Sequence, residues 1–323
     1  MSETPFGRGD YSPTGTYNAI LLSDELLARL SDAPDRAGLA GWLASLPCPV
    51  IGLGPDGDEV CDAIVQSDAD LEAVLANIDR APVAAMTLVQ VLRATSRMGV
   101  AEGLTLESLA YGTLQKGREH LVWHATRGVS EPGIEPAASV LNSAPVLLER
   151  DRDTLAIRLN RPERLNAISV EIRDALCEAL QLVGSDSTIR AVTVSGNGRC
   201  FSIGGDLDEF GTTPDPATAH AVRSVRLPAL QLSQCADRVT FRLHGACIGA
   251  GIELPAFGHR VIAAKNTFFQ LPEIRYGLIP GAGGCVGIPR RIGRQRTAYL
   301  ALSARRISAV NALAWGLIDA IED

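Results

Sequence analysis

Apolar residues recur at two different spacings along this chain. Between Ala69 and Gly128 they return every three or four positions, in ADLEAVLANI, PVAAMTLVQVLRA and LTLESLAYGTLQKGREHLVWHA, which predicts amphipathic helices. From Pro145 onward, short alternating or β-branched segments take turns with helical ones. This repeated patterning predicts an α/β core whose parallel strands are joined by right-handed crossovers.

The second half of the chain contains distinct predicted elements. Strands are expected at residues 154–160, 191–195, 239–243 and 261–264, and helices at 170–183 and 217–235. Pro228 lies inside the second of these helices and should break or kink it, because proline cannot donate a helical hydrogen bond. Residues 296–323 predict two helices, split at 306–309, followed by a last short strand.

The beginning of the chain follows another pattern. Residues 1–17 are rich in Gly, Pro and Ser and predict a loose arm, whereas residues 19–46 predict two short helices around a turn at 32–35, before a strand at 49–53. We therefore expect a mainly helical region over residues 1–143 and a β/α core over residues 144–323. The Pro- and Ser-containing stretch at 129–143 is expected to link them.

Two local patterns resemble ligand sites but favour plainer explanations. Residues 52–57, GLGPDG, match the dinucleotide-binding spacing GxGxxG, yet Pro-Asp-Gly is turn chemistry and no apolar helix opening follows, so no NAD site is predicted. His120 and His124 have the spacing of metal ligands on a helix, but no third ligand is evident nearby. We interpret both histidines as helix-face residues and predict no metal site.

The composition narrows the range of partners. At 323 residues, 46% of them hydrophobic, the chain is long enough to bury a large core. A net charge of −7 argues against nucleic acid, whose binding needs a basic surface. Seven cysteines without a CxxC pair predict a reduced, cytoplasmic protein, and no apolar run reaches the roughly 18 residues of a membrane span. No permanently bound cofactor is expected.

The stretch from Val239 to Arg291 concentrates the candidate chemistry. It places Glu253 and Glu273 among glycine-rich turns and short apolar runs. A glycine-rich turn that opens a helix leaves backbone N–H groups free, and such groups stabilise developing negative charge. The two carboxylates are therefore expected to flank an oxyanion site.

Four segments, in this order, resemble the motifs of the crotonase family, the enoyl-CoA hydratases and isomerases. They are RPERLNAIS at 161–169, CFSIGGDLDEF at 200–210, HGACIGAGIEL at 244–254 and LPEIRYGLIPGAGG at 271–284. The resemblance implies a crotonase-like ββα superhelix core that binds an acyl-CoA thioester, with coenzyme A as part of the substrate. It also implies a homo-oligomer, a trimer or a hexamer.

The same resemblance implies roles for individual residues. Glu253 and Glu273 would be the catalytic pair, and the N–H groups of Ile203 and Ala250 would form the oxyanion hole. The remaining substrate- and CoA-binding positions would be Arg164, Leu165, Ala167, Ser202, Gly204, Gly205, Asp206, Gly249, Gly251, Pro272 and Gly281. Two glutamates favour syn hydration of a 2-enoyl-CoA. Isomerisation, thioester hydrolysis, carbon–carbon cleavage and a non-catalytic partner subunit stay open as alternatives.

One departure from the family pattern concerns the order of the segments. The chain ends at Asp323, the last residue of AWGLIDAIED, where the family continues into helices that cover the site and build the oligomer. Residues 69–128 resemble those helices. The resemblance therefore implies a permuted arrangement, in which this helical segment packs against the β/α core and completes the site from the N-terminal side.

Overall fold

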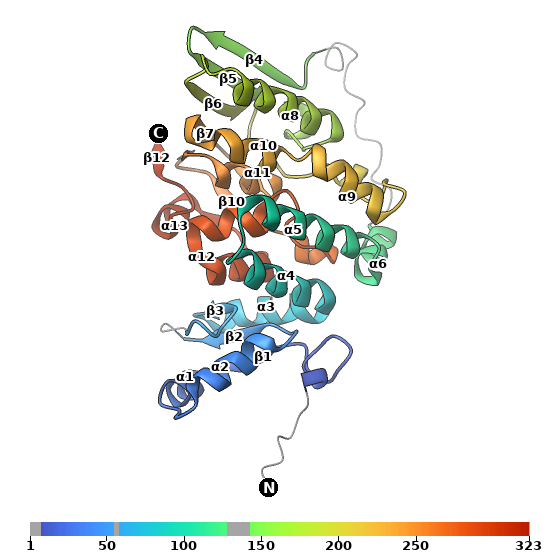
Figure 1. Ribbon diagram of the computed structural model, residues 1–323, viewed down its shortest axis with the longest axis vertical. Coiled ribbons are helices and arrows are strands. Elements are labelled where there is room, and N and C mark those ends of the chain that lie inside the picture. Colours follow the sequence, from blue (N-terminus) through green and yellow to red (C-terminus); the bar gives the residue numbers. More distant parts are fainter. Residues whose placement is uncertain (1–7, 55–57, 128–142, 323) are drawn as a thin grey trace.

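A six-stranded sheet carries the second half of the chain in the computed structural model, which describes residues 8–54, 58–127 and 143–322 (Figure 1). The strand order is β12-β9-β7-β6-β5-β4, and every neighbouring pair is parallel except the antiparallel pair β4–β5. The bounds are β4 (Val146–Asp151), β5 (Thr154–Leu159), β6 (Ala191–Gly196), β7 (Val239–Leu243), β9 (Arg260–Ala264) and β12 (Ala320–Glu322). The four strands predicted at 154–160, 191–195, 239–243 and 261–264 are present, and so is the last short strand, β12.

Helices α8 (Val170–Ser185) and α10 (Pro228–Cys235) pack against each other beside this sheet. Helix α8 begins at Ser169, whose hydroxyl accepts a hydrogen bond from the N–H of Ile172 at 3.3 Å, as an N-cap residue should. The predicted break at Pro228 is confirmed, because α9 (Pro216–Val225) ends before it and α10 begins with it. This break leaves α9 free to turn away from the sheet.

A second, three-stranded sheet positions the two glutamates. Its order is β11-β10-β8, with the bounds Ile307–Ser308, Phe268–Gln270 and Ala246–Ile248. Strands β8 and β10 are parallel neighbours, so their carboxyl ends meet at the same edge. Helix α11 (Ala250–Glu253) follows β8, and the 3-10 turn η6 (Glu273–Tyr276) follows β10. The two glutamates, far apart in sequence, are thereby brought to one place.

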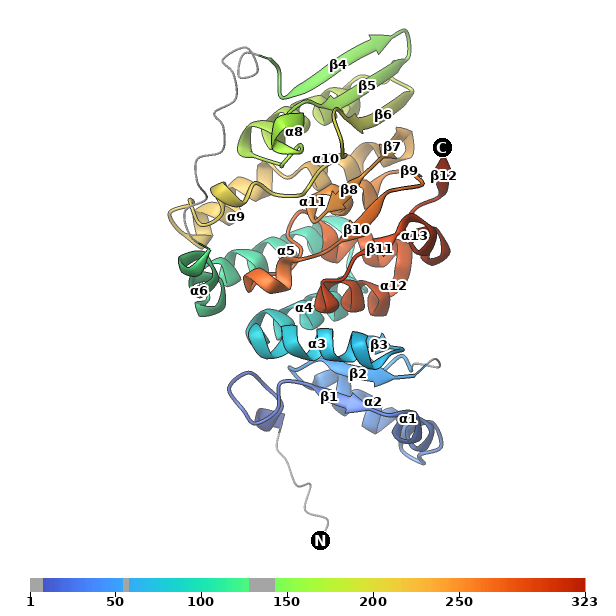
Figure 2. The same ribbon diagram turned by 180° about the vertical axis from the view of Figure 1, so that it is seen from behind.

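The predicted helical segment packs against the β/α core, as Figure 2 shows from behind. It comprises α3 (Asp68–Arg80), α4 (Pro82–Thr95), α5 (Val100–Gln115) and α6 (Arg118–Thr126). Helices α3, α4 and α5 all contact α12 (Gly284–Ser303), which precedes α13 (Ala309–Trp315). The buried amide of Asn77 donates to the carbonyls of Leu302 and Ser303 at 2.8 and 3.1 Å. Within the described residues, the predicted contact between this segment and the core is therefore confirmed.

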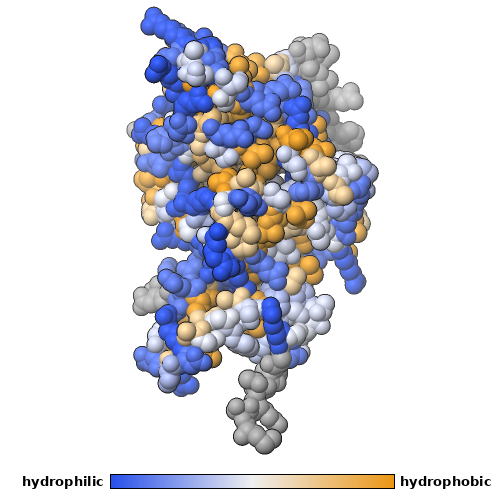
Figure 3. Space-filling view, viewed as in Figure 1, coloured by the Kyte–Doolittle hydropathy of each residue, from blue (hydrophilic) through white to orange (hydrophobic). Residues whose placement is uncertain are grey.

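The apolar side of α4 packs inside the monomer. Its residues Ala84, Leu88, Val89 and Leu92 are buried. Helices α3, α5 and α12 cover them. The remaining apolar surface gathers over the middle of the molecule in Figure 3, and the homo-oligomer stays a prediction.

The region before residue 143 contains strands as well as helices. A parallel three-stranded sheet, β1-β2-β3, lies with α1 (Asp24–Ser31) and α2 (Arg36–Ser45) at the end of the molecule opposite β4. Its strands are Ile20–Leu22, Val50–Leu53 and Ala63–Val65. Only the second of these was predicted, because the other two are three residues long and too short to show an alternation.

A buried carboxylate joins this small sheet to the rest. Asp62, which is 1% exposed, accepts hydrogen bonds from Arg93 of α4 and from Arg294 of α12, the latter at 2.6 Å. Its second oxygen also accepts from the N–H of Val50 at 2.9 Å. One side chain thus holds β2, α4 and α12 together.

The Asp62→Asn variant is expected to be destabilised by about 3 kcal/mol or more, because removing one partner of a buried ion pair leaves the other charge uncompensated. Urea unfolding followed by circular dichroism measures the difference. Asp68→Asn, an exposed aspartate at the start of α3, is the matched control and should change stability by less than about 0.5 kcal/mol. Equal stabilities of the two variants would contradict the role given to Asp62.

Candidate active site

A cavity of about 210 Å³ lies where α5, α9, α11 and η6 meet. Its walls come from both regions of the chain. The lining side chains and backbone include Tyr111, Gln115, Ile168, Ser169, Arg173, Gly205, Asp206, Glu209, Phe210, Val222, Arg223, Arg226, Ala250, Glu253, Leu254, Glu273, Gly281 and Ala282. Of the predicted site residues, the structure brings Gly205, Asp206, Ala250, Glu253, Glu273 and Gly281 to this cavity.

The two predicted catalytic glutamates lie side by side. Glu253 is 2% and Glu273 is 8% exposed. A Cβ atom placed on Gly249 would lie 2.6 Å from Oε1 of Glu273 and 3.8 Å from Oε1 of Glu253. Gly249 has a φ of 51°, which also favours glycine. This glycine therefore makes the space into which both carboxyl groups point.

The surroundings of the two carboxyl groups differ. Oε2 of Glu253 accepts hydrogen bonds from the backbone N–H groups of Ala282 and Gly284, at 2.7 and 2.9 Å. Burial raises the pKa of Glu253 to about 7, although these N–H groups and Arg223 oppose the rise. Oε2 of Glu273 has no hydrogen-bond partner among the described residues. Burial and the neighbouring Glu253 raise the pKa of Glu273 well above its usual range. The environment therefore separates two chemically identical groups.

A third buried carboxylate, Glu107, reaches the same place from α5. It is 1% exposed, and its two oxygens accept from the N–H groups of Gly283 and Cys285 at 2.7 and 2.8 Å. Burial and Glu253 raise the pKa of Glu107 well above its ordinary value. Glu107 and Glu253 thus hold alternate N–H groups at the start of α12, where the helix dipole favours negative charge.

Glu107 was missed in the sequence, although a signal was present. It occupies the buried face of α5 between Leu104 and Tyr111, at the i, i+3 and i+7 positions of that face. A carboxylate on an otherwise apolar helix face is rarely buried without a partner. Its partners lie about half the chain length away in the sequence, however, so no local pattern could identify them.

The first predicted oxyanion donor is not available. The N–H of Ile203 donates to the carbonyl of Leu165 at 3.2 Å, and Ile203 does not line the cavity. Gly205 lines it together with Ala250, and within the described residues neither N–H group donates to a protein acceptor. A Cβ atom on Gly204 would lie 3.5 Å from the nitrogen of Ala250, so the two backbone segments run close together. The geometry favours Gly205 in place of Ile203.

Several other predicted contact residues lie behind the cavity lining and do not line the cavity themselves. Ser202 is fully buried, donates to the carbonyl of Asn166 at 2.7 Å and accepts from the N–H of Gly204 at 3.1 Å. A Cβ atom on Gly251 would lie 2.4 Å from the carbonyl oxygen of Ser202. Neither position is free to touch a ligand through a side chain. Leu165, Ala167, Gly204, Gly249 and Pro272 likewise do not line the cavity.

Arg164 does not line the cavity, but it pairs with Asp206, which does. Their side chains are 3.4 Å apart, and that of Arg164 is 55% exposed. Asp206 also caps the turn η3 (Leu207–Glu209), because its Oδ1 accepts from the N–H of Asp208 at 3.0 Å. Asn166, buried behind them, donates to the carbonyls of Cys200 and Phe201 and so ties the first two family-like segments together.

The two histidines of α6 connect that helix to the core. Nδ1 of His120 lies 2.8 Å from the carbonyl oxygen of Tyr276, and Nε2 of His124 lies 3.2 Å from that of Phe210.

Among the described residues, no group of three or more His, Cys, Asp or Glu side chains is arranged to hold a metal ion. In the same part of the chain, no helix is both long and apolar enough to cross a membrane.

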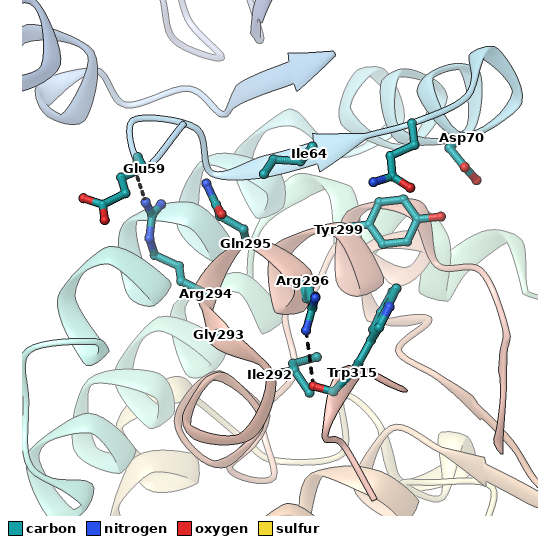
Figure 4. A pocket seen from close by; sticks show the side chains of 11 residues that line it. Glu59, Ile64, Asp70, Ile292, Gly293, Arg294, Gln295, Arg296, Tyr299 and Trp315 are labelled. Carbon is teal, nitrogen blue, oxygen red and sulfur yellow. Dashed lines mark hydrogen bonds between the residues drawn. The ribbon is translucent and has the colours of Figure 1, made fainter. Parts of the chain in front are cut away.

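A larger cavity, of about 710 Å³, lies elsewhere, between β3 and α12 (Figure 4). Three of its four charged side chains, those of Asp70, Arg294 and Arg296, are already engaged. Arg294 donates to the carbonyl of Glu59 at 2.8 Å, Arg296 to that of Trp315 at 3.3 Å, and Asp70 pairs with Arg305 at 2.8 Å. The space follows from the interruption of α12 at Gly293, whose φ is 80°. Size alone therefore does not identify the reactive site, and the smaller cavity holds the paired glutamates.

Comparison with known proteins agrees with the arrangement of the four segments. The family model described as enoyl-CoA hydratase/isomerase matches residues 149–322. The chain belongs to this family. It is 35% identical over 182 residues to 1,2-epoxyphenylacetyl-CoA isomerase of Escherichia coli (strain K12), which covers 55% of this chain and 70% of that protein. It is 31% identical over 174 residues to 2,3-dehydroadipyl-CoA hydratase of the same organism, covering 54% and 68%.

A solved structure of an enoyl-CoA hydratase is similar to this chain in fold. Enoyl-CoA hydratase from Thermoplasma volcanium GSS1 superposes with a TM-score of 0.51 at 34% identity, covering 57% of this chain and 73% of that one. The crotonase-family core thus accounts for somewhat more than half of the chain. Hydratases and isomerases both occur among these relatives, so family membership leaves the reaction open.

The Glu107→Gln variant is expected to be less stable by about 1–3 kcal/mol. Each carboxylate oxygen of Glu107 now accepts from one backbone N–H group, and the glutamine amide has only one oxygen, so one of the two N–H groups would lose its acceptor. Chemical unfolding measures the loss. Glu102→Gln, an exposed position on the same helix, is the control and should be near neutral. Equal stability of the two variants would show that Glu107 does not hold the start of α12.

Proposed function

We propose that the protein catalyses the syn addition of water to the double bond of a 2-enoyl-CoA thioester. The observation that carries the proposal is the pair of buried glutamates that line one cavity in different environments. Membership of the enoyl-CoA hydratase/isomerase family supports an acyl-CoA substrate. Addition across a double bond needs one group for water and another for the α carbon, and this pair can supply both.

The thioester would be activated by backbone N–H groups. In this proposal, Gly205 and Ala250 donate to the carbonyl oxygen, whose negative charge grows as the enolate forms. Both N–H groups border the cavity, and within the described residues neither has a protein acceptor. Main-chain donors in a buried site are already oriented, so they need no reorganisation when charge develops.

The environments of the two carboxyl groups suggest their roles. Glu253, with a pKa of about 7, would be ionised in part of the population near neutral pH and would take a proton from water as its oxygen bonds to the β carbon. Glu273, whose pKa burial and Glu253 raise well above its usual range, would be protonated and would give its proton to the α carbon. The addition leaves Glu253 protonated and Glu273 ionised, and proton exchange with solvent restores both.

We infer further that α3–α6 stand in for the helices that follow the core in relatives. The support is that α5 brings Tyr111 and Gln115 to the cavity and Glu107 to the start of α12. An isomerase would need only one base to move a proton, and it is the principal alternative. A thioester hydrolase, a carbon–carbon lyase and a non-catalytic subunit are the others.

Glu253→Gln and Glu273→Gln should each lower the turnover of enoyl-CoA hydration at least about a hundredfold, because each removes a proton-transfer group. The double variant should be scarcely worse than the poorer single one, since the two groups act as a unit. Glu253→Gln should keep the local hydrogen bonds. In the wild-type protein, Oε2 alone accepts from both backbone N–H groups, and the amide oxygen of glutamine can do the same. Hydration is followed by loss of the enoyl-thioester absorbance.

The pattern of the two variants separates the alternatives. An isomerase would lose activity with Glu273→Gln and keep it with Glu253→Gln. A hydrolase would release free CoA from the wild-type protein, which a thiol reagent detects. If neither substitution changes turnover on the best substrate, the two-glutamate mechanism is wrong.

The pH dependence of kcat/KM should follow the ionisation of Glu253. Because its pKa is raised to about 7, the base is protonated and inactive at lower pH, and kcat/KM should rise as pH increases through about 7. A fall at higher pH should follow as Glu273 loses its proton. A profile that is flat between pH values of about 5 and 8 would exclude Glu253 as the base.

A further inference from the structure

One arginine of the cavity has no anionic partner. Three arginines line the walls. Arg173 pairs with Asp174 at 2.8 Å, and Arg226 lies 3.5 Å from Glu178, a charge contact in which its Nη1 makes no hydrogen bond. Arg223 of α9 forms no ion pair with any described residue. Among the described residues, its guanidinium therefore has no carboxylate within ion-pair distance.

The immediate surroundings of Arg223 satisfy only part of its side chain. The guanidinium carbon lies 4.0 Å from the centre of the Tyr111 ring, which stabilises the face of the cation. The N–H groups point outward in the plane of the guanidinium, and Nη1 is buried without a hydrogen-bond partner among the described residues. A buried donor without an acceptor is costly, so a ligand oxygen at this point would relieve the cost.

Arg223 belongs to the same end of the cavity as the reacting groups. Tyr111, on which it lies, packs against Gly281, and the next residue, Ala282, donates to Glu253. The charge of Arg223 opposes the rise in the pKa of Glu253 and of Glu107, whereas Arg173 and Arg164 act on Glu209. An acyl group whose thioester carbonyl lies at Gly205 and Ala250 can therefore extend past the glutamates towards Arg223.

The neighbouring apolar space offers little alternative. An apolar recess behind Ala250, lined by residues such as Leu176, Val194 and Leu232, has a volume of only about 20 Å³. That is close to the space one water molecule needs and far below the volume of an alkyl chain. A long aliphatic acyl group would have to displace packed core residues there, whereas Arg223 and Tyr111 offer polar groups within the larger cavity.

We propose that Arg223 binds a carboxylate at the far end of the acyl group, so that the protein prefers short 2-enoyl-CoA thioesters whose acyl chain ends in a carboxylate. The inference rests on the proposed function in one respect, that an acyl-CoA thioester occupies this cavity. A carboxylate would supply acceptor oxygens in the plane of the guanidinium, which suits arginine better than lysine.

The first test compares matched pairs of short 2-enoyl-CoA thioesters in which a terminal methyl is replaced by a carboxylate. The wild-type protein should favour the carboxylated member at least about tenfold in kcat/KM, as expected for a charge-assisted hydrogen bond. Arg223→Met should abolish this preference, and Arg223→Lys should keep only part of it. Arg226→Met, which removes a cavity arginine that is already paired, is the control and should leave the ratio unchanged.

The second test measures binding of saturated thioesters, one carboxylated and one methyl-ended, by calorimetry. Because these compounds cannot be hydrated, the arm tests Arg223 even if hydration is not the reaction. Tighter binding of the carboxylated compound, lost in Arg223→Met, supports the inference whatever the chemistry. Hydration without any preference would overturn the inference and leave the proposed function standing. An equal loss for both compounds in Arg223→Met would also overturn it, since Arg223 would then hold a CoA phosphate or act on the glutamates alone.

Discussion

Four successive backbone N–H groups, from Ala282 to Cys285, are held alternately by two buried carboxylates, and much of the site depends on this arrangement. Glu253 takes the first and third, and Glu107 takes the second and fourth. The start of a helix has free N–H groups and the positive end of the helix dipole. It can therefore stabilise a buried carboxylate whose charged form burial would otherwise disfavour. The same contacts fix α5 and α11 to α12.

This arrangement carries an electrostatic conflict that serves the proposed chemistry. Burial raises the pKa of Glu107, Glu253 and Glu273, and the nearby charge of Glu253 raises those of Glu107 and Glu273 further, so charging all three at once is unfavourable. The N–H groups of α12 support two of them and leave Glu273 without a partner at Oε2. Protons are therefore shared unequally among three like groups, which is the condition for one to act as a base while another acts as an acid.

Close backbone approach is the second requirement of the site, and glycine meets it. A side chain on Gly249 would fill the space that both carboxyl groups face, and one on Gly281 would lie 2.2 Å from the ring of Tyr111. Tyr111 in turn supports Arg223. The N-terminal helices are thus part of the cavity wall itself, because a residue of α5 determines how closely the loop before α12 can pack.

The sequence by itself determined the features whose signals are local. The alternation of apolar residues predicted β5, β6, β7 and β9, Pro228 predicted the break between α9 and α10, and four ordered segments predicted the family and the two glutamates. It could not show β1, β3 or β8, which are too short for a period, or the burial of α4 against α12. Tertiary structure alone decided that Ile203 donates to Leu165, so that Gly205 faces the cavity. It also decided that Glu107 bonds to Gly283 across 176 positions, because hydrogen bonds between distant segments leave no periodic trace in the chain.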